Sequence, residues 1–393
     1  MKILYRGSHL VGATLLISGT CIGVGMLALP VATAAAGFVA SLPIYLLVWI
    51  FMLSMSRLIV EACLWCPKDS NLITISRTLL GNKGAAACWI LYLFLFYCLM
   101  VAHTVAGGGA VVGILGGSLP YWASTLLYIF VFAPAVYLGT LWVDRLNLAL
   151  MTGVIVTFLL FVFDSSPSIQ FEFLKRNDLS KAWFALPVLF TAFGFQNLIP
   201  TLVNYTERND KLLMKAIWIG TAIPLALYLV WQLLIHGIVP YESLAKAFAN
   251  GDNAVMSLQQ TLVKSSISKI GAAFAFFAMT TSFIGIAIAF FDFWADGLKW
   301  KKKGIKKAWL MGLVFGIPYA IASIDPKIFF VALTWAGGIG AALLLGIMPI
   351  LFVWSGRYLQ KRSRAHDELP GGKITLSVLF LFCLFVIYQM LNF

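Results

Sequence analysis

Charged side chains are scarce in this chain: Asp, Glu, Lys and Arg make up 11% of its 393 residues, whereas hydrophobic residues make up 61%. A soluble domain has about 25% charged and about 45–50% apolar residues, so a fold built for water is excluded. Long polar stretches are also missing, which leaves no room for a separate soluble domain. We therefore expect an all-α polytopic membrane protein with a single transmembrane domain over residues 1–393.

Histidine and cysteine are rare, with four and six copies, and the cysteines are scattered over the apolar runs. The sequence has no HExxH motif, no phosphate-binding glycine loop and no cluster of membrane carboxylates. We therefore expect no enzyme, no bound metal and no cofactor apart from a coupling ion. A channel is disfavoured as well, because its continuous polar stripe or charged ring is missing.

Apolar runs fill the chain instead. Since about 20 apolar residues cross a bilayer, the sequence predicts eleven spans, near residues 10–36, 38–63, 86–114, 120–141, 146–163, 184–206, 213–239, 268–294, 307–323, 327–354 and 373–392. An N-terminus in the cytoplasm places most of the 28 Lys and Arg on the inner side, as the positive-inside rule requires. The C-terminus is then periplasmic. The net charge of +13 reflects this orientation and predicts no nucleic-acid partner, and no obligate protein partner is evident.

The spans form two similar sets. Spans 6 to 10 begin at offsets of about 174 to 187 residues from spans 1 to 5. We expect a first repeat at about 10–163, a second at about 184–354 and an extra helix at 373–392. Because five is odd, the second repeat is inverted, which is a recurring plan among secondary transporters.

Two features lie at the inner membrane surface. The segment NLITISRTLLG, residues 71–81, has apolar residues near helical spacing, and we expect an amphipathic helix that packs on the protein or takes part in gating. Arg57 and Glu61 are four residues apart near the end of span 2, a spacing that favours an ion pair within the helix.

Helix-breaking residues interrupt spans 1 and 6. They lie in GTCIGVGMLALP (residues 19–30) and FTAFGFQNLIPTLVNY (residues 190–205), and both stretches place glycine and polar residues at mid-span before a proline. Non-helical backbone at this depth is tolerated only where it is buried in protein or lines a wet cavity. Glycine also serves close helix packing, but the paired position of the breaks predicts that they face each other across a binding site.

A pair of broken helices suits an amino acid. We expect the substrate carboxylate on the N–H groups of residues 23–25, at the positive end of the second half-helix, and the ammonium on carbonyls near Ala192 and Phe193. Tyr97 is expected to reach the carboxylate, and the amides at 196 and 197 to bind a substrate hydroxyl or indole N–H. The predicted substrate-binding residues are Ser18, Gly19, Thr20, Gly23, Val24, Gly25, Tyr97, Ala192, Phe193, Gly194, Phe195, Gln196 and Asn197.

Two sets of residues are candidates for ion coupling. His103 is the most central ionisable residue and could relay a proton, or form a hydrogen bond between helices. The hydroxyls of Thr280, Thr281 and Ser282 could bind sodium as a hard cation, or join helices. The sequence leaves proton and sodium coupling open.

The motifs GTCIGVGMLALP, FGFQNLIPTLVNY and TSFIGIAIAFFDFWADGL resemble the hydroxy and aromatic amino acid permease family of the amino acid, polyamine and organocation superfamily. Within it the chain is most similar to bacterial, particularly chlamydial, tyrosine-specific permeases. Many relatives have a histidine where this chain has Gln196.

The resemblance implies import of an aromatic amino acid, tyrosine above all, coupled to protons across a bacterial inner membrane. A bundle of spans 1, 2, 6 and 7 would rock against a scaffold of spans 3, 4, 8 and 9. The alternatives are a sodium-coupled carrier of tryptophan, serine or threonine, and an amino acid sensor.

Overall fold

The computed structural model describes residues 2–262, 265–325, 327–362 and 369–391, and within these ranges the chain is helical without a strand. Among these described residues, ten helices are long and apolar enough to cross a membrane, or eleven when the bent pair His9–Cys21 and Val24–Ala32 counts as one span. The all-α polytopic fold and its eleven spans are therefore confirmed. The broken first span is among them.

The first repeat and the segment that follows it run to residue 175. They consist of α1 (Lys2–Cys21), α2 (Val24–Ala32), α3 (Phe38–Leu64), α4 (Leu72–Ile114), α5 (Tyr121–Leu138), α6 (Thr140–Ser165), η1 (Ser166–Ser168) and η2 (Phe171–Lys175).

The second repeat begins at α7 and contains short π-helical segments in spans 9 and 10. Its elements are α7 (Leu179–Ala182), η3 (Trp183–Ala185), α8 (Leu186–Ala192), η4 (Gln196–Leu198), α9 (Ile199–Tyr205), α10 (Asp210–Ile238), α11 (Tyr241–Asn250), α12 (Ala254–Thr261), α13 (Ser266–Gly297), α14 (Gly304–Met311), η5 (Gly312–Gly316), α15 (Ile317–Ile324), α16 (Ile328–Trp335), η6 (Ala336–Ile347), α17 (Met348–Trp354) and η7 (Ser355–Leu359). The eleventh span is α18 (Gly372–Leu391).

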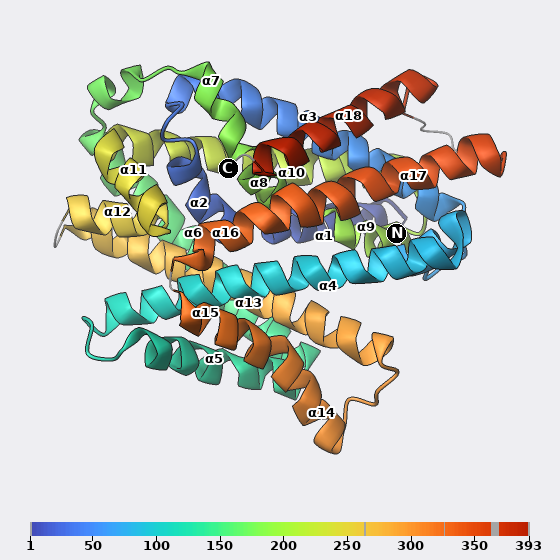
Figure 1. Cartoon of the computed structure of the whole chain (residues 1–393), viewed down its shortest axis with the longest axis horizontal. Coiled ribbons are helices and arrows are strands. Elements are labelled where there is room, and N and C mark those ends of the chain that lie inside the picture. The colour runs from blue at the N-terminus through green and yellow to red at the C-terminus, as the bar shows by residue number, and fades with distance from the viewer. Residues whose placement is uncertain (1, 263–264, 326, 363–368, 392–393) are drawn as a thin grey trace.

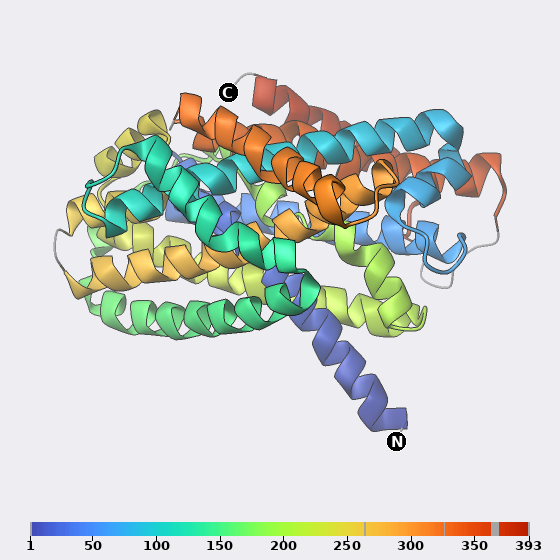
Figure 2. The same ribbon diagram turned by 90° about the horizontal axis from the view of Figure 1, so that it is seen from below.

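Most of the long helices lie roughly along one common axis (Figure 1). α4 packs against both α13 and α16 along the long axis of the molecule (Figure 1). α11 and α12 lie together at one end, on the left in Figure 1, where both pack against α2. Seen from below, the first turns of α1 extend away from the other helices (Figure 2).

α4 begins earlier than predicted, because the amphipathic segment and span 3 form one helix with a kink. The helix starts after Asn71, whose side chain accepts a hydrogen bond from the Thr74 N–H at 2.9 Å. Gly81 then adopts φ 75°, which breaks the helical path where glycine has no steric penalty. Leu72 and Leu79 before the kink are buried. The segment is thus a helix packed on the protein.

Hydrogen bonds join spans 1, 2 and 7 into one unit, which we call the bundle together with span 6. Ser18 Oγ donates to the Gly220 carbonyl at 2.8 Å, and Trp49 Nε1 donates to Thr221 Oγ1 at 2.9 Å. The Gln232 amide joins span 7 to span 2, since it accepts from Tyr45. Buried polar groups in a membrane interior require such partners.

A second set of bonds joins span 3 to span 9 and span 4 to span 8, and we call these four spans the scaffold. The Tyr97 hydroxyl donates to the Leu313 carbonyl at 3.2 Å, linking α4 to η5. The Tyr128 hydroxyl donates to Thr280 Oγ1 at 3.2 Å, linking α5 to α13. These tyrosines place a polar end inside an otherwise apolar contact.

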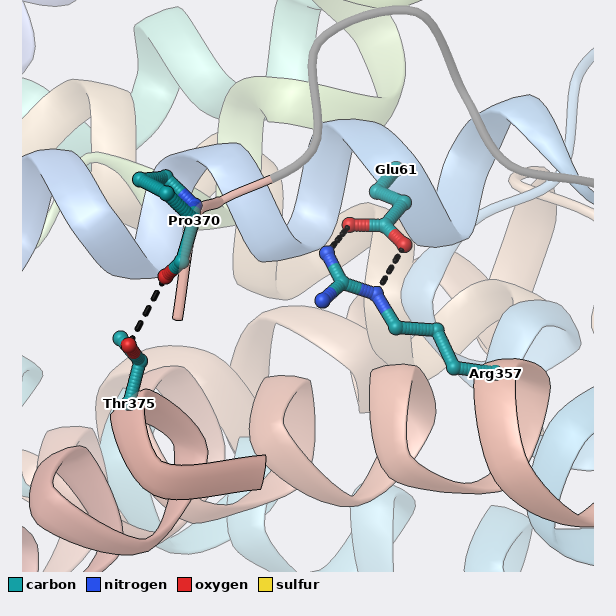
Figure 3. A network of polar contacts seen from close by, with 4 residues as sticks. All are labelled: Glu61, Arg357, Pro370 and Thr375. Atoms are coloured by element: carbon teal, nitrogen blue, oxygen red, sulfur yellow. Dashed lines mark hydrogen bonds and ion pairs between the residues drawn. The ribbon is translucent and has the colours of Figure 1, made fainter. Parts of the chain in front are cut away.

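A buried ion pair joins the bundle to span 10. Arg357 donates from Nε to Glu61 Oε1 at 2.7 Å and from a terminal nitrogen to Oε2 at 2.6 Å, and the two side chains are 9% and 2% exposed (Figure 3). Next to it, Thr375 Oγ1 donates to the Pro370 carbonyl at the start of α18 (Figure 3). The ion pair of Glu61 with Arg57 stays a prediction, and the bidentate partner Arg357 comes from the far end of the second repeat. Spacing within one helix cannot reveal such a partner.

Candidate functional site: two interrupted helices

The first interruption separates α1 from α2. α1 ends at Cys21, and α2 begins at Val24 after an axis change of 52°. Gly23 caps α2 in an extended conformation, with φ −172° and ψ −152°. The first N–H groups of a helix have no carbonyl four residues earlier, so the start of α2 offers donors and a partial positive charge in the middle of the membrane domain.

The second interruption lies in span 6. α8 ends at Ala192, and residues 193–195 are not helical before η4 resumes the chain toward α9. The Gly194 N–H bonds back to the Thr191 carbonyl at 3.2 Å, and the Phe195 N–H bonds to the Phe193 carbonyl at 2.9 Å. The predicted break in span 6 is thus present.

The two interruptions are in contact. A Cβ atom at Gly25 would lie 2.9 Å from Ala192 Cα and 3.2 Å from its backbone nitrogen, a separation at which something must shift. Glycine therefore lets the first turn of α2 approach the last turn of α8. Of the predicted residues, Val24, Ala192, Phe193 and Phe195 are buried at this junction.

Tyr228 of α10 joins the two interruptions through its hydroxyl group. Its hydroxyl lies 2.6 Å from the Cys21 carbonyl oxygen and 2.8 Å from the Ala192 carbonyl oxygen. These are the last residues of α1 and α8, where helix carbonyls lack partners. Tyr228 is fully buried, and its ring packs edge-on against Phe193 with centroids 5.1 Å apart. Tyr228 is not among the residues predicted from the sequence.

Ser282 connects the first interruption to the scaffold. Its hydroxyl donates to the Ile22 carbonyl at 3.1 Å, and a Cβ atom at Gly23 would lie 2.9 Å from Ser282 Cβ. Thr280 accepts from Tyr128 on α5, and Thr281 donates to Asn147 on α6. The three predicted hydroxyls thus meet three different elements, because consecutive helical residues point in different directions.

The amides at 196 and 197 supply acceptors near the second interruption. Gln196 is fully buried, and its Nε2 lies 3.0 Å from Met52 Sδ. Within the described part of the chain, neither Gln196 Oε1 nor Asn197 Oδ1 has a hydrogen-bond partner. A buried amide oxygen without a partner is costly, so a donor from a ligand would fit both atoms.

Other predicted residues turn away from the interruptions. Tyr97 bonds to span 9, Ser18 bonds to span 7, and the Thr20 hydroxyl donates to the Leu16 carbonyl of its own helix at 2.8 Å. Gly19 and Gly194 are half-buried. The structure therefore brings together residues 23–25, 192–193 and Ser282, and leaves Tyr97 and Thr20 bonded elsewhere.

His103 lies in the scaffold. Its Nδ1 is 2.8 Å from the Leu99 carbonyl of the same helix, and the side chain is 2% exposed. Nε2 has no partner among the described residues. The ring is thus oriented by its own helix and keeps one nitrogen for another proton donor or acceptor.

Tyr228 had a weak signal in the sequence. It stands in the middle of span 7, a span assigned to the bundle, in the stretch LALYLVWQLL. A tyrosine in a mid-membrane position must place its hydroxyl on a partner, but the sequence holds 13 tyrosines. Only the arrangement of the two interruptions distinguishes this one.

Comparison with solved structures identifies the fold. The chain superposes on MhsT in complex with L-phenylalanine with a TM-score of 0.65 at 13% identity, covering 97% of this chain and 98% of MhsT. It superposes on a manganese transporter from Eremococcus coleocola with a TM-score of 0.61 at 13% identity, covering 97% and 85%. The fold is one that membrane transporters use.

Comparison of sequences identifies the family. The profile of the tryptophan/tyrosine permease family matches residues 6–390, and the chain belongs to this family. The tryptophan-specific transport protein of Haemophilus influenzae is 29% identical over 96% of this chain and 94% of its own length. Tyrosine-specific transport system 1 of the same organism is 30% identical over 94% and 93%. The protein is therefore an amino acid permease of the membrane, and not an enzyme.

Proposed function

We propose that this protein imports tyrosine together with protons by alternating access, with its N-terminus in the cytoplasm of a bacterium and its C-terminus in the periplasm. The observation on which the proposal rests is the contact of two interrupted spans through Gly25, Ala192 and Tyr228. Fixed charges are not needed to bind a zwitterion there, because helix ends provide both poles.

In this proposal the substrate carboxylate binds the free N–H groups at the start of α2, at residues 23–25. The ammonium binds on the side of span 6, on the backbone carbonyls near Phe193 and on Asn197 Oδ1, whereas Gln196 Oε1 accepts from the substrate ring; neither amide oxygen has a partner in the described part of the chain. Tyr228 holds the carbonyl ends of α1 and α8 in register, so that donors and acceptors keep a fixed spacing. Preorganised polar groups of this kind bind without a large reorganisation cost.

Alternating access requires two bodies that move as units. Hydrogen bonds within the bundle and within the scaffold favour such a division, since they join spans of the same body to one another. Between them, the hydrogen bond from Ser282 to the Ile22 carbonyl is a polar contact that can break and re-form. Rocking of one bundle of helices against the rest is a usual mode of alternating access for such folds.

Tryptophan is the second candidate substrate. The relatives include permeases described as tryptophan-specific and as tyrosine-specific at almost the same identity, 29% and 30%. The phenol O–H and the indole N–H are both donors, so an amide oxygen such as Gln196 Oε1 accepts from either. Tyrosine remains our choice because of the similarity to tyrosine-specific permeases noted for the three motifs.

Proton coupling is proposed through His103, whose Nε2 is buried without a partner among the described residues. Sodium coupling through Ser282 and the Ile22 carbonyl is the alternative. An ionisable residue inside a membrane domain is costly and is usually functional.

The test is uptake of labelled tyrosine and tryptophan into proteoliposomes, with a pH gradient and a sodium gradient imposed separately. We expect accumulation with the pH gradient alone and exchange of labelled tyrosine in counterflow. His103→Gln should abolish accumulation but keep counterflow. Accumulation with the sodium gradient alone would show that sodium, and not the proton, is the coupling ion. The absence of counterflow would refute transport.

A further inference from the structure

A cavity lies apart from the interruptions. Its volume is about 780 Å³, and residues of α12 and of the turn between α11 and α12 are among those that line it. α4, α12 and α13 form its walls, and the start of span 10 closes one side. None of residues 18–25 or 192–197 lines it. Sites for small molecules have volumes of roughly 300–1,000 Å³, so this cavity is large enough for one.

Opposite charges face each other at the rim of this outer cavity. Asp252, from the turn between α11 and α12, and Lys327, from the turn before α16, both line it. The Lys327 ammonium stabilises the Asp252 carboxylate electrostatically, and no salt bridge in the described part of the chain joins them. Burial raises the pKa of the Asp252 carboxyl above its ordinary value, while a hydrogen bond with the Asn250 side chain and the charge of Lys327 oppose that rise. Neither charge is neutralised by a direct ion pair with the other, so each can attract a ligand group of the opposite sign.

Gly251 fixes the two charges relative to each other. It ends α11 with φ 75°, a conformation that favours glycine. A Cβ atom at this position would lie 2.8 Å from Lys327 Cα and 2.9 Å from its carbonyl carbon. The turn that bears Asp252 therefore packs directly on the backbone of Lys327, and the spacing of the two charged groups is built into the fold.

The inner wall of the cavity is apolar and aromatic. Phe276, Phe277 and Met279 come from α13, Met256 from α12 and Phe329 from α16. Aromatic and thioether side chains pack well against an aromatic ring. An aromatic side chain would thus be buried below, with charged groups above it at the rim.

We propose that this outer cavity binds an aromatic amino acid as a zwitterion, its carboxylate on Lys327, its ammonium on Asp252 and its ring against the Phe276 wall. This inference deepens the proposed function and rests on it for the identity of the ligand. The site holds substrate at the outer end before it reaches the two interruptions. Lys269, which also lines the cavity, adds to the attraction for the carboxylate.

Occupancy can be measured without transport, by protection of an introduced cysteine. Gly113 lines the cavity, and a Cβ atom there meets nothing within 4 Å, so Gly113→Cys fits without displacing a neighbour. The native cysteines are buried or half-buried, so a membrane-impermeant maleimide should react with the new thiol. Gln259→Cys on α12 reports from the opposite wall. Ser118→Cys, exposed in the outer turn and outside the cavity, is the control.

L-Tyrosine should slow labelling at both cavity positions and leave Ser118→Cys unaffected. In the Gly113→Cys background, Asp252→Asn or Lys327→Gln should raise about tenfold the L-tyrosine concentration that halves the labelling rate. This is the loss of affinity expected when one charge-assisted hydrogen bond is removed. Lys327→Gln should also make tyrosine protect no better than tyramine, which lacks the carboxylate. Asp252→Asn should make tyrosine protect no better than 3-(4-hydroxyphenyl)propionate, which lacks the ammonium. Lys246→Gln, on an exposed α11 position outside the cavity, should change nothing.

The outcome separates the outer site from the interruptions. Protection that survives Gln196→Leu supports the outer site even where uptake by that variant is lost. The proposal is overturned if tyrosine protects neither cysteine. It is also overturned if Gln196→Leu shifts protection while Asp252→Asn and Lys327→Gln do not, because closure around the interruptions would then cause the protection.

Discussion

The Tyr228 hydroxyl lies 2.6 Å from the carbonyl oxygen of Cys21. Cys21 is the last residue of α1, and the same hydroxyl is 2.8 Å from the Ala192 carbonyl at the end of α8. A hydroxyl has one proton, so it donates to one carbonyl at a time and attracts both. Span 7 thereby ties together two helices that belong to different repeats.

Tyr228→Phe should impair transport without preventing insertion. The phenylalanine ring keeps the contact with Phe193, but the carbonyl ends of α1 and α8 lose their donor. Hydrogen bonds between membrane helices are worth about 0.6 kcal/mol and at most about 1.7 kcal/mol, so the fold should survive. We expect roughly a tenfold rise in the KM for tyrosine uptake, equivalent to about 1.4 kcal/mol.

The matched control is Tyr319→Phe, which removes a hydroxyl bonded to the Trp122 carbonyl at 3.5 Å at the edge of the scaffold. It should transport normally. Unchanged uptake by Tyr228→Phe would mean that the bridge between the carbonyl ends has no functional role.

Gly25→Ala should reduce uptake although it adds a single methyl group. The new Cβ would lie 2.9 Å from Ala192 Cα, so α2 and α8 must separate, and overpacking of this kind costs about 1–3 kcal/mol. Gly285→Ala on α13 is the control, because its Cβ meets nothing within 4 Å. Initial rates in proteoliposomes, normalised to inserted protein, give the comparison, and equal rates for the two variants would contradict the close approach.

Gln196→Leu should weaken uptake of tyrosine more than uptake of phenylalanine, because only tyrosine offers a hydroxyl to Oε1. Thermal stability should not fall, since leucine replaces a buried amide whose oxygen has no partner in the described part of the chain. Gln232→Leu should behave in the opposite way. It removes the partner of Tyr45 and Ser41 and should lower the melting temperature. Equal losses for tyrosine and phenylalanine would show that the Gln196 amide does not contact the substrate ring.

Arg357→Met should destabilise the fold strongly. It leaves the Glu61 carboxylate, 2% exposed, without its bidentate partner, and removing one member of a buried pair costs roughly 3–5 kcal/mol. The double variant Glu61→Leu/Arg357→Met should recover much of that loss, because neither member of the pair is then left buried without the other. Melting temperatures in detergent for the two single variants and the double variant complete the cycle, and additive losses would mean that the pair does not couple.

The interruptions could be predicted because helix breakers at mid-membrane are local and visible in sequence. The paired stretches at residues 19–30 and 190–205 each place glycine before proline, and both spans are broken in the structure. Glu61 is a contrasting case, since its partner Arg357 is distant in sequence and no local spacing leads to it. Tyr97 shows the same limit, because its hydroxyl reaches span 9, a contact set by helix rotation.

The sequence by itself determined the membrane environment, the number of spans, the paired interruptions and the family, because each depends on apolar run length, helix-breaking residues or linear motifs. The tertiary structure alone decided which side chains meet: Tyr228 at two carbonyl ends, Ser282 at the first interruption, and Asp252 with Lys327 at the outer cavity. The physical reason is that a helix fixes the spacing of its own residues but not its rotation against a neighbour. That rotation follows from the packing of all the helices together.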